Sequence, residues 1–197
     1  MTPRQSFLKA VYPILMLKEK LFHKTGNVLS NHQQIKPILS FYELFANANN
    51  GTTFSFSLLK GKNVMLVNTA SNCGYTAQYA ELEKLYEQQK GSLIILAFPS
   101  NDFKQQGQKS DEEIASFCKM NYGVSFPIMK KSVVIKNPEQ NMVFEWLSNP
   151  DKNGWCSQAP LWNFSKYLIN REGTLTHFFA STVSPLSKAV KRAIQEY

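Results

Sequence analysis

The sequence contains little that would support a disulfide scaffold, a zinc centre or a membrane span. It has three cysteines in 197 residues, an odd and widely spaced set that does not fit a disulfide framework. None of them has a Cys-x-x-Cys or Cys/His spacing typical of zinc. The apolar segment 7–17 is shorter than a bilayer span and is interrupted by Lys9 and Pro13. Internal repeats and low-complexity linkers are missing too, so the length indicates one main domain.

Acidic residues are also few. The chain has 14 acidic and 22 basic side chains and a net charge of +8. Residues 1–36 hold six of the basic side chains and a single acidic one, Glu19, so +5 of this charge lies in the N-terminal arm. The remaining chain is only weakly basic, and we therefore expect no nucleic-acid partner.

We divide the chain into a basic N-terminal extension, residues 1–39, and a main domain, residues 40–197. Pro13 suits the first turn of a helix that runs toward Lys24, so the extension is expected to be helical or partly disordered. The simpler interpretation is a helix packed on the domain or a frayed leader. The alternative is weak contact between residues 1–36 and an anionic membrane surface.

The main domain begins with alternating strand, helix and strand signals. Residues 64–67 form a β-branched apolar run, helical spacing starts at Thr76 and stops near Gly91, and residues 93–98 form a second apolar run before Pro99. This order predicts a right-handed β-α-β unit with two parallel strands.

The flanking segments extend this pattern. An Asn-Asn-Gly turn at 49–51 predicts a hairpin before the unit. A capping box at 110–113 begins a helix that ends at Gly123, residues 142–147 form a short helix, and residues 167–169 and 175–179 form a second hairpin. Ser184 and Pro185 are expected to cap the last helix. The order predicts an α/β chain with a thioredoxin-like fold, in which helices flank a central mixed sheet and an N-terminal β-hairpin precedes it.

Cys73 lies between the first strand and the first helix of this unit. The unpaired backbone N–H groups and the dipole of a helix N-terminus favour an anion there. Such a setting lowers the pKa of a thiol and yields the thiolate, which is the nucleophile. A lone cysteine is otherwise most often a small buried hydrophobe. Its position makes Cys73 the first candidate for chemistry.

Three segments, in order, resemble the glutathione peroxidase family. Residues 68–76, Asn-Thr-Ala-Ser-Asn-Cys-Gly-Tyr-Thr, are similar to the family's nucleophile segment. Residues 98–103, Phe-Pro-Ser-Asn-Asp-Phe, are similar to its second block, and residues 161–164, Leu-Trp-Asn-Phe, to its third. The resemblance runs from about Ser40 to the C-terminus and implies a peroxidase of the non-selenium, cysteine-containing type.

The resemblance assigns four catalytic residues. Cys73 matches the family's peroxidatic cysteine. Gln106 matches its catalytic glutamine, and Trp162 and Asn163 match the tryptophan and asparagine of its third block. Donors of this kind can stabilise both the thiolate and the oxyanion that leaves when the peroxide bond breaks. Without the resemblance, each of the three would be read as an ordinary core or surface residue.

The second block departs from the usual family pattern. Ser100 and Asp102 stand where the family usually has cysteine and glutamine. Two adjacent glutamines follow, so Gln105 is an alternative to Gln106 as the catalytic amide.

Residues 111–127 resemble the segment that carries the resolving cysteine in members reduced by thioredoxin, and Cys118 occupies that position. A sulfenic acid on Cys73 would condense with Cys118 to a disulfide. Since a disulfide needs Cα atoms within roughly 7 Å, we expect the Cys118 helix to unwind locally. The alternative is that Cys118 is only a core residue. Cys156 has no role that the resemblance assigns.

The resemblance therefore implies a thiol peroxidase that reduces hydrogen peroxide and organic or lipid hydroperoxides and is recycled by thioredoxin. It implies no cofactor or metal, and the lack of the long insertion before the Trp-Asn block favours a monomer. Two cycling thiols indicate the cytoplasm, or the envelope if the arm is a leader or anchor. Three alternatives stay open: a peroxide sensor that passes its disulfide to a partner, a one-cysteine peroxidase that uses glutathione, and a silent thioredoxin-fold binding module. Retention of all four family positions argues against the last.

Overall fold

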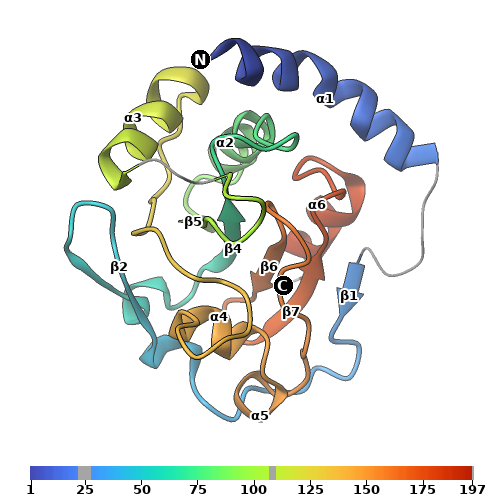
Figure 1. The fold of residues 1–197 in the computed structure, drawn as a ribbon. Helices are drawn as coiled ribbons and strands as arrows, with labels where there is room; N and C mark the ends of the chain where they lie inside the picture. Colours follow the sequence, from blue (N-terminus) through green and yellow to red (C-terminus); the bar gives the residue numbers. More distant parts are fainter. Residues whose placement is uncertain (22–27, 107–109, 197) are drawn as a thin grey trace.

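The computed structural model describes residues 1–21, 28–106 and 110–196, without the side chains of residues 18–21. Its centre is a five-stranded sheet (Figure 1). The strands follow the order β1 (Val28–Ser30), β7 (Leu175–Phe179), β6 (Lys166–Ile169), β4 (Asn63–Thr69) and β5 (Leu93–Pro99). Strands β4 and β5 are parallel and the other three pairings are antiparallel. This mixed sheet with flanking helices confirms the expected fold class.

The β4–β5 pair forms where the sequence predicts it. All seven residues of β4 are buried, as expected for a strand with helices or loops on both faces. Helix α2 (Gln78–Gln88) makes the crossover between the two strands. The hairpin predicted around the Asn-Gly turn is also present, as β2 (Phe45–Asn47) and β3 (Thr53–Ser55), with Gly51 at φ 84°.

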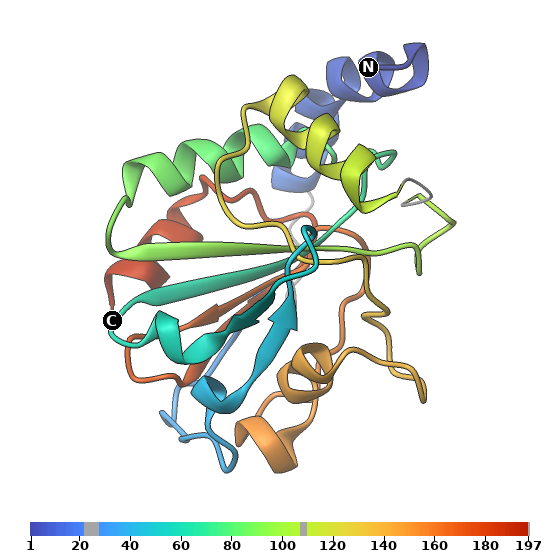
Figure 2. The same ribbon diagram turned by 90° about the vertical axis from the view of Figure 1, so that its left-hand side faces the viewer.

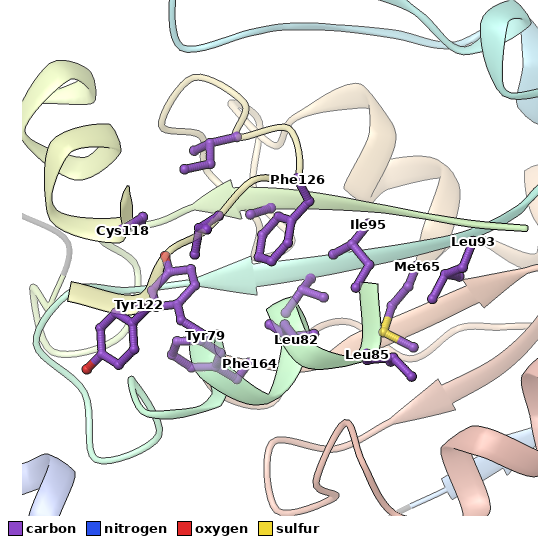
Figure 3. Close-up of a cluster of buried hydrophobic side chains, with 14 of the residues drawn as sticks. Met65, Tyr79, Leu82, Leu85, Leu93, Ile95, Cys118, Tyr122, Phe126 and Phe164 are labelled. Atoms are coloured by element: carbon purple, nitrogen blue, oxygen red, sulfur yellow. The ribbon is translucent and has the colours of Figure 1, made fainter. Parts of the chain in front are cut away.

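Two hydrophobic clusters cover the two faces of the sheet, because alternate residues of each strand point to opposite sides. The first lies under α2, α3 (Asp111–Tyr122) and α6 (Lys188–Gln195), and Figure 3 shows part of it. The second lies on the opposite face, where Figure 2 shows α4 (Met142–Leu147), α5 (Pro150–Asn153) and the 3-10 turns η1 (Phe41–Glu43) and η2 (Phe56–Leu59). Of these, α4, η1 and η2 contribute side chains to the cluster. The candidate chemistry is on the side of the first cluster, which contains both Cys73 and Cys118.

The N-terminal helix differs from the expectation. Helix α1 runs from Pro3 to Leu21, so Pro13 lies in its interior rather than in its first turn. Pro3 has the position at the helix start that suits proline. Pro13 lacks an N–H group and removes one helical hydrogen bond, and contacts with the domain offset that loss. Tyr12 and Gln5 are buried, and Gln5 Nε2 donates to the Ser71 carbonyl at 3.0 Å.

The other contacts of α1 reach α3 and the Cys73 loop. The Lys9 ammonium lies 5.2 Å from the centre of the Tyr122 ring, and the N-terminal amine contacts the Asn121 amide oxygen. A Cβ atom on Gly74 would lie 3.5 Å from the Leu15 side chain. Both ribbon views show α1 beside α3 (Figures 1 and 2). Among the described residues, none of the helices has the length and apolar character to cross a membrane.

The last helix also begins later than expected. Helix α6 starts at Lys188, and Ser187, not Ser184, caps it by accepting the N–H of Val190. The Ser184 hydroxyl donates instead to the Glu81 carboxylate at 2.7 Å. A tertiary hydrogen bond therefore replaced the local cap. The proposed boundary at residue 40 stays a prediction, although β1, which precedes it, pairs with β7.

Loss of the capping box should weaken α3, the helix that carries Cys118. Ser110 Oγ accepts the N–H of Glu113, and the Glu113 carboxylate accepts the N–H of Ser110. We expect Ser110→Ala to lower the free energy of unfolding by about 1 kcal/mol, measured by urea titration. Ser116→Ala, an exposed position in the same helix, is the control and should leave stability nearly unchanged. Equal midpoints for Ser110→Ala and the wild type would contradict this role.

Candidate active site

The three resemblance segments converge at one edge of the sheet. Parallel strands β4 and β5 end at this edge, so residues 70–76 and 100–106 leave it side by side. Strand β6 is antiparallel to β4 and begins at the same edge, with Lys166 opposite Val67. The Trp-Asn turn that precedes β6 therefore meets the Cys73 loop. Topology alone brings the expected residues together.

Cys73 lies in a tight, buried turn. Its side chain is 1% exposed, and Sγ accepts the N–H of Tyr75 at 3.5 Å. The Cys73 N–H donates to Thr76 Oγ1, and Thr76 Oγ1 donates back to the Cys73 carbonyl. Helix α2 begins only at Gln78, and its N-cap residue makes no side-chain hydrogen bond. The thiol is thus held by a turn rather than directly by a helix N-terminus.

The pKa of Cys73 is raised, which corrects the expectation from the sequence. Burial is the main cause, because removal from water disfavours the thiolate. Hydrogen bonds from the Tyr75 N–H, the side chains of Trp162 and Asn163, and the Gly74 N–H lower the pKa but do not cancel this effect. The sequence pattern gave the position of the cysteine but not how fully the fold covers it.

Trp162 and Asn163 lie in a turn with an unusual backbone. The next residue, Phe164, has φ 69°, a left-handed conformation that costs an aromatic residue about 1–3 kcal/mol. The turn is held by Asn68 at the end of β4. The Asn68 side chain donates to the Trp162 carbonyl at 3.1 Å. The backbone carbonyl of Asn68 accepts the Phe164 N–H at 2.6 Å. Sequence reasoning assigned no role to Asn68, although it stands in the first resemblance segment.

The two adjacent glutamines differ in position. Gln106 Oε1 accepts a hydrogen bond from Asn163 Nδ2 at 3.0 Å, and the Gln106 carbonyl accepts the N–H of Asn72. Gln105 is exposed, with φ 52°. The Gln106 side chain is therefore in direct contact with the Trp-Asn turn.

The loop after β5 also covers Trp162. The Phe103 ring lies 5.4 Å from the Trp162 ring, and the Lys104 ammonium is 5.7 Å from its centre. Asp102, one of the departures from the family pattern, has a structural role. Its carboxylate accepts the N–H groups of Val134 and Ile135 at 2.6 and 3.2 Å. Asp102 thus fixes the loop after β5 to the segment after α3.

Cys118 lies on the inner face of α3 and is fully buried (Figure 3). The Tyr79 side chain points toward it, and burial together with the neighbouring Cys118 raises the pKa of the Tyr79 hydroxyl. Cys73 and Cys118 share one hydrophobic cluster, and neither forms a disulfide. The described geometry is therefore that of the reduced protein.

Cys156 belongs to the cluster on the opposite face of the sheet. Burial raises its pKa to about 11, and its backbone is bound by the Asn153 side chain. The fold keeps this third cysteine away from the other two. Within the residues that the structure describes, His, Cys, Asp and Glu form no group of three or more that could hold a metal ion.

The family model of glutathione peroxidases matches residues 41–148. The chain belongs to the glutathione peroxidase family. It is 43% identical over 150 residues to glutathione peroxidase-like peroxiredoxin 2 of Saccharomyces cerevisiae, a match that covers 75% of this chain and 91% of that protein. It is 42% identical over 147 residues to glutathione peroxidase homolog BsaA of Staphylococcus epidermidis, covering 74% and 92%.

A solved structure agrees with this membership. The crystal structure of T. cruzi GPX1 superposes with a TM-score of 0.59 at 29% identity and covers 79% of this chain and 97% of that one. The family expected from the three segments is therefore confirmed. The family match begins at residue 41, so the N-terminal arm lies outside it.

The donors around Cys73 should control its pKa. Trp162→Phe removes the indole N–H that stabilises the thiolate, so the pKa of Cys73 should rise further. At pH 7, below that pKa, the variant then has a smaller thiolate fraction than the wild type. Alkylation of its Cys73 by iodoacetamide should slow about tenfold, since a hydrogen bond to a charged group contributes about 1.5 kcal/mol. The difference should disappear at high pH.

Trp155→Phe is the matched control. It also removes a bonded indole N–H, which donates to the Leu175 carbonyl at 2.7 Å in the other cluster. Cys73 of this variant should be alkylated at the wild-type rate. The reaction is monitored by mass spectrometry of the Cys73 peptide. The same rate for Trp162→Phe as for the wild type at pH 7 would show that the indole does not stabilise the thiolate.

Proposed function

We propose that the protein is a thiol peroxidase that reduces hydrogen peroxide and organic or lipid hydroperoxides at Cys73. The observation that supports this most strongly is the set of side-chain donors on the buried Sγ atom, Trp162 and Asn163, with Gln106 bonded to Asn163. The Trp162 indole and the Asn163 amide donate hydrogen bonds without competing as nucleophiles. Family membership supports the same reaction.

In the proposed reaction the Cys73 thiolate attacks one oxygen of the hydroperoxide. The S–O bond forms as the O–O bond breaks, which leaves a sulfenic acid and an alkoxide or hydroxide that takes up the proton released by the thiol. Amide and indole donors stabilise the departing oxyanion. The Asn163 Oδ1 atom is buried and has no partner among the described residues, so it can accept the O–H of a bound hydroperoxide.

Cys118 is the proposed resolving cysteine. Its thiol condenses with the sulfenic acid, water leaves, and the Cys73–Cys118 disulfide is then reduced by thioredoxin through thiol exchange. Both residues are buried, and Cys118 lies within a capped helix. We therefore propose that part of α3 opens after Cys73 is oxidised.

The Cys118→Ser variant separates the two steps. We expect it to keep the first oxidation, with one equivalent of hydroperoxide giving sulfenic acid on Cys73. Turnover with thioredoxin should fall by about two orders of magnitude or more, because no disulfide can form. Both are measured by peptide mapping and by steady-state thioredoxin oxidation.

Cys156→Ser is the control and should turn over like the wild type. Full turnover of Cys118→Ser with thioredoxin would refute resolution by Cys118. Turnover of that variant with glutathione alone would identify the one-cysteine alternative. A stable mixed disulfide with one protein, without turnover, would identify a peroxide sensor.

We further propose that the protein acts as a monomer in the cytoplasm. Three cysteines that form no disulfide suit a reducing compartment. A solution mass near 22.5 kDa would agree with a monomer, and a mass of twice that value would refute it.

Helix α1 supports weak contact with an anionic membrane surface as an additional property. Phe7, Ile14 and Leu17 are between 58% and 66% exposed. Their spacing of seven and three residues places them on one side of the helix. Arg4 supplies positive charge nearby. An exposed apolar stripe with flanking cations is typical of interfacial helices.

Replacement of Phe7, Ile14 and Leu17 by Ser should abolish co-sedimentation with phosphatidylglycerol-containing vesicles at low salt. The apolar stripe and the cations act together, so high salt should release the wild type. The control replaces three comparably exposed residues outside α1, Ile38, Leu58 and Leu161, by Ser. Failure of the wild type to bind such vesicles would remove this proposal without affecting the peroxidase.

A further inference from the structure

Lys166 is a fully buried charged residue that the proposed reaction does not use. It is 0% exposed and lies at the start of β6, in the middle of the sheet. Burial lowers the pKa of its ammonium to about 7, and the Glu81 carboxylate partly opposes this shift. Burying such a group is unfavourable unless it makes compensating hydrogen bonds.

The ammonium makes two short hydrogen bonds to neutral acceptors. Nζ donates to the Phe164 carbonyl at 2.6 Å and to Gln78 Oε1 at 2.8 Å. These acceptors lie on different elements. Phe164 follows directly after Trp162 and Asn163, and Gln78 is in the first turn of α2, directly after the Cys73 loop. Lys166 thus connects the segment that carries the donors with the segment that carries the thiol.

Both acceptors are themselves held in place. The Gln78 N–H donates to the Tyr75 carbonyl, and the Gln78 side-chain amide donates to the Ser181 carbonyl at 2.6 Å. Phe164 has the left-handed backbone described above, which persists only where the surroundings determine it. The Lys166 bond to its carbonyl is one of the contacts that fix this conformation, and hence the direction of the neighbouring Asn163 side chain.

We propose that Lys166 is a positioning residue for the peroxidase reaction: its ammonium ties the Trp-Asn turn to the first turn of α2 and so holds the Trp162 and Asn163 donors on the Cys73 sulfur. The inference rests on the proposed function of Cys73. It does not require Lys166 to touch the hydroperoxide, since the residue acts through the Phe164 carbonyl and the Gln78 side chain.

The test variant is Lys166→Met, which keeps the length of the side chain and removes its donors. Two quantities are measured on the full-length protein: the second-order rate constant for oxidation of Cys73 by hydrogen peroxide, and the pKa of Cys73 from the pH profile of iodoacetamide alkylation. We expect the rate constant to fall about tenfold or more and the pKa of Cys73 to rise, because the donors are no longer aimed at the sulfur. A purely structural role would lower stability and leave the pKa unchanged.

Asn63→Leu is the control for loss of a buried polar group. Asn63 lies at the opposite end of β4, is buried, and donates to the Ile194 carbonyl at 3.0 Å. It should lose stability but keep the wild-type rate constant and pKa of Cys73. Gln78→Met serves as a second variant. It removes the α2 side of the connection, together with the bond to the Ser181 carbonyl, and should change both quantities in the same direction.

Wild-type values of both quantities in a folded Lys166→Met protein would overturn the proposal. If that variant does not fold, wild-type values in Gln78→Met would overturn it. The alkylation profile does not depend on peroxide. A wild-type protein that fails to react with peroxide would therefore refute the proposed function, whereas the pKa comparison would still decide whether Lys166 positions the donors.

Discussion

The site depends on the hydrogen bonds of Asn68, which connect the end of β4 to the segment that leads into β6. Its side chain and backbone bind the Trp162 carbonyl, the Phe164 N–H and Ser165, so the end of β4 and the start of β6 form one unit. The Cys73 loop follows β4 directly after Asn68 and Thr69, and the Trp-Asn turn directly precedes β6. A buried amide that bonds several groups is costly to remove, since each partner would be left unsatisfied. The distance between thiol and donors is therefore a property of the sheet rather than of flexible loops.

Burial gives this thiol two opposing properties. Exclusion of water raises its pKa and reduces the amount of nucleophile. The same exclusion strengthens the hydrogen bonds that stabilise charge on sulfur and on the leaving oxygen. The donors therefore act most effectively once charge develops, and a small polar substrate that reaches the sulfur meets an environment already arranged for it.

The sequence predicted the parts of the fold that follow from local patterns. The β4–β5 pair, the Asn-Gly hairpin and the α3 capping box are set by apolar runs and turn residues, and the structure has all three. The predicted starts of α1 and α6 were wrong. Helix α1 begins at Pro3 rather than near Pro13. At α6, Ser184 bonds to Glu81 instead of capping the helix.

Much of the candidate site was accessible only through resemblance. Pattern and composition indicated Cys73, but the roles of Gln106, Trp162 and Asn163 came from ordered family segments. The bonds made by Asn68 and by Lys166 join residues about ninety positions apart, and no periodicity in the sequence reports such pairs. The raised pKa of Cys73 likewise depends on how the whole chain packs over it.

Helix α1 bonds to the Ser71 carbonyl through Gln5 and contacts the last turn of α3 through Lys9 and the Tyr122 ring, yet it lies before the region that the family model matches. A protein that docks over both the Cys73 loop and the end of α3 therefore also touches α1. Its fit to this chain is determined partly by residues that lie outside the family-matched region.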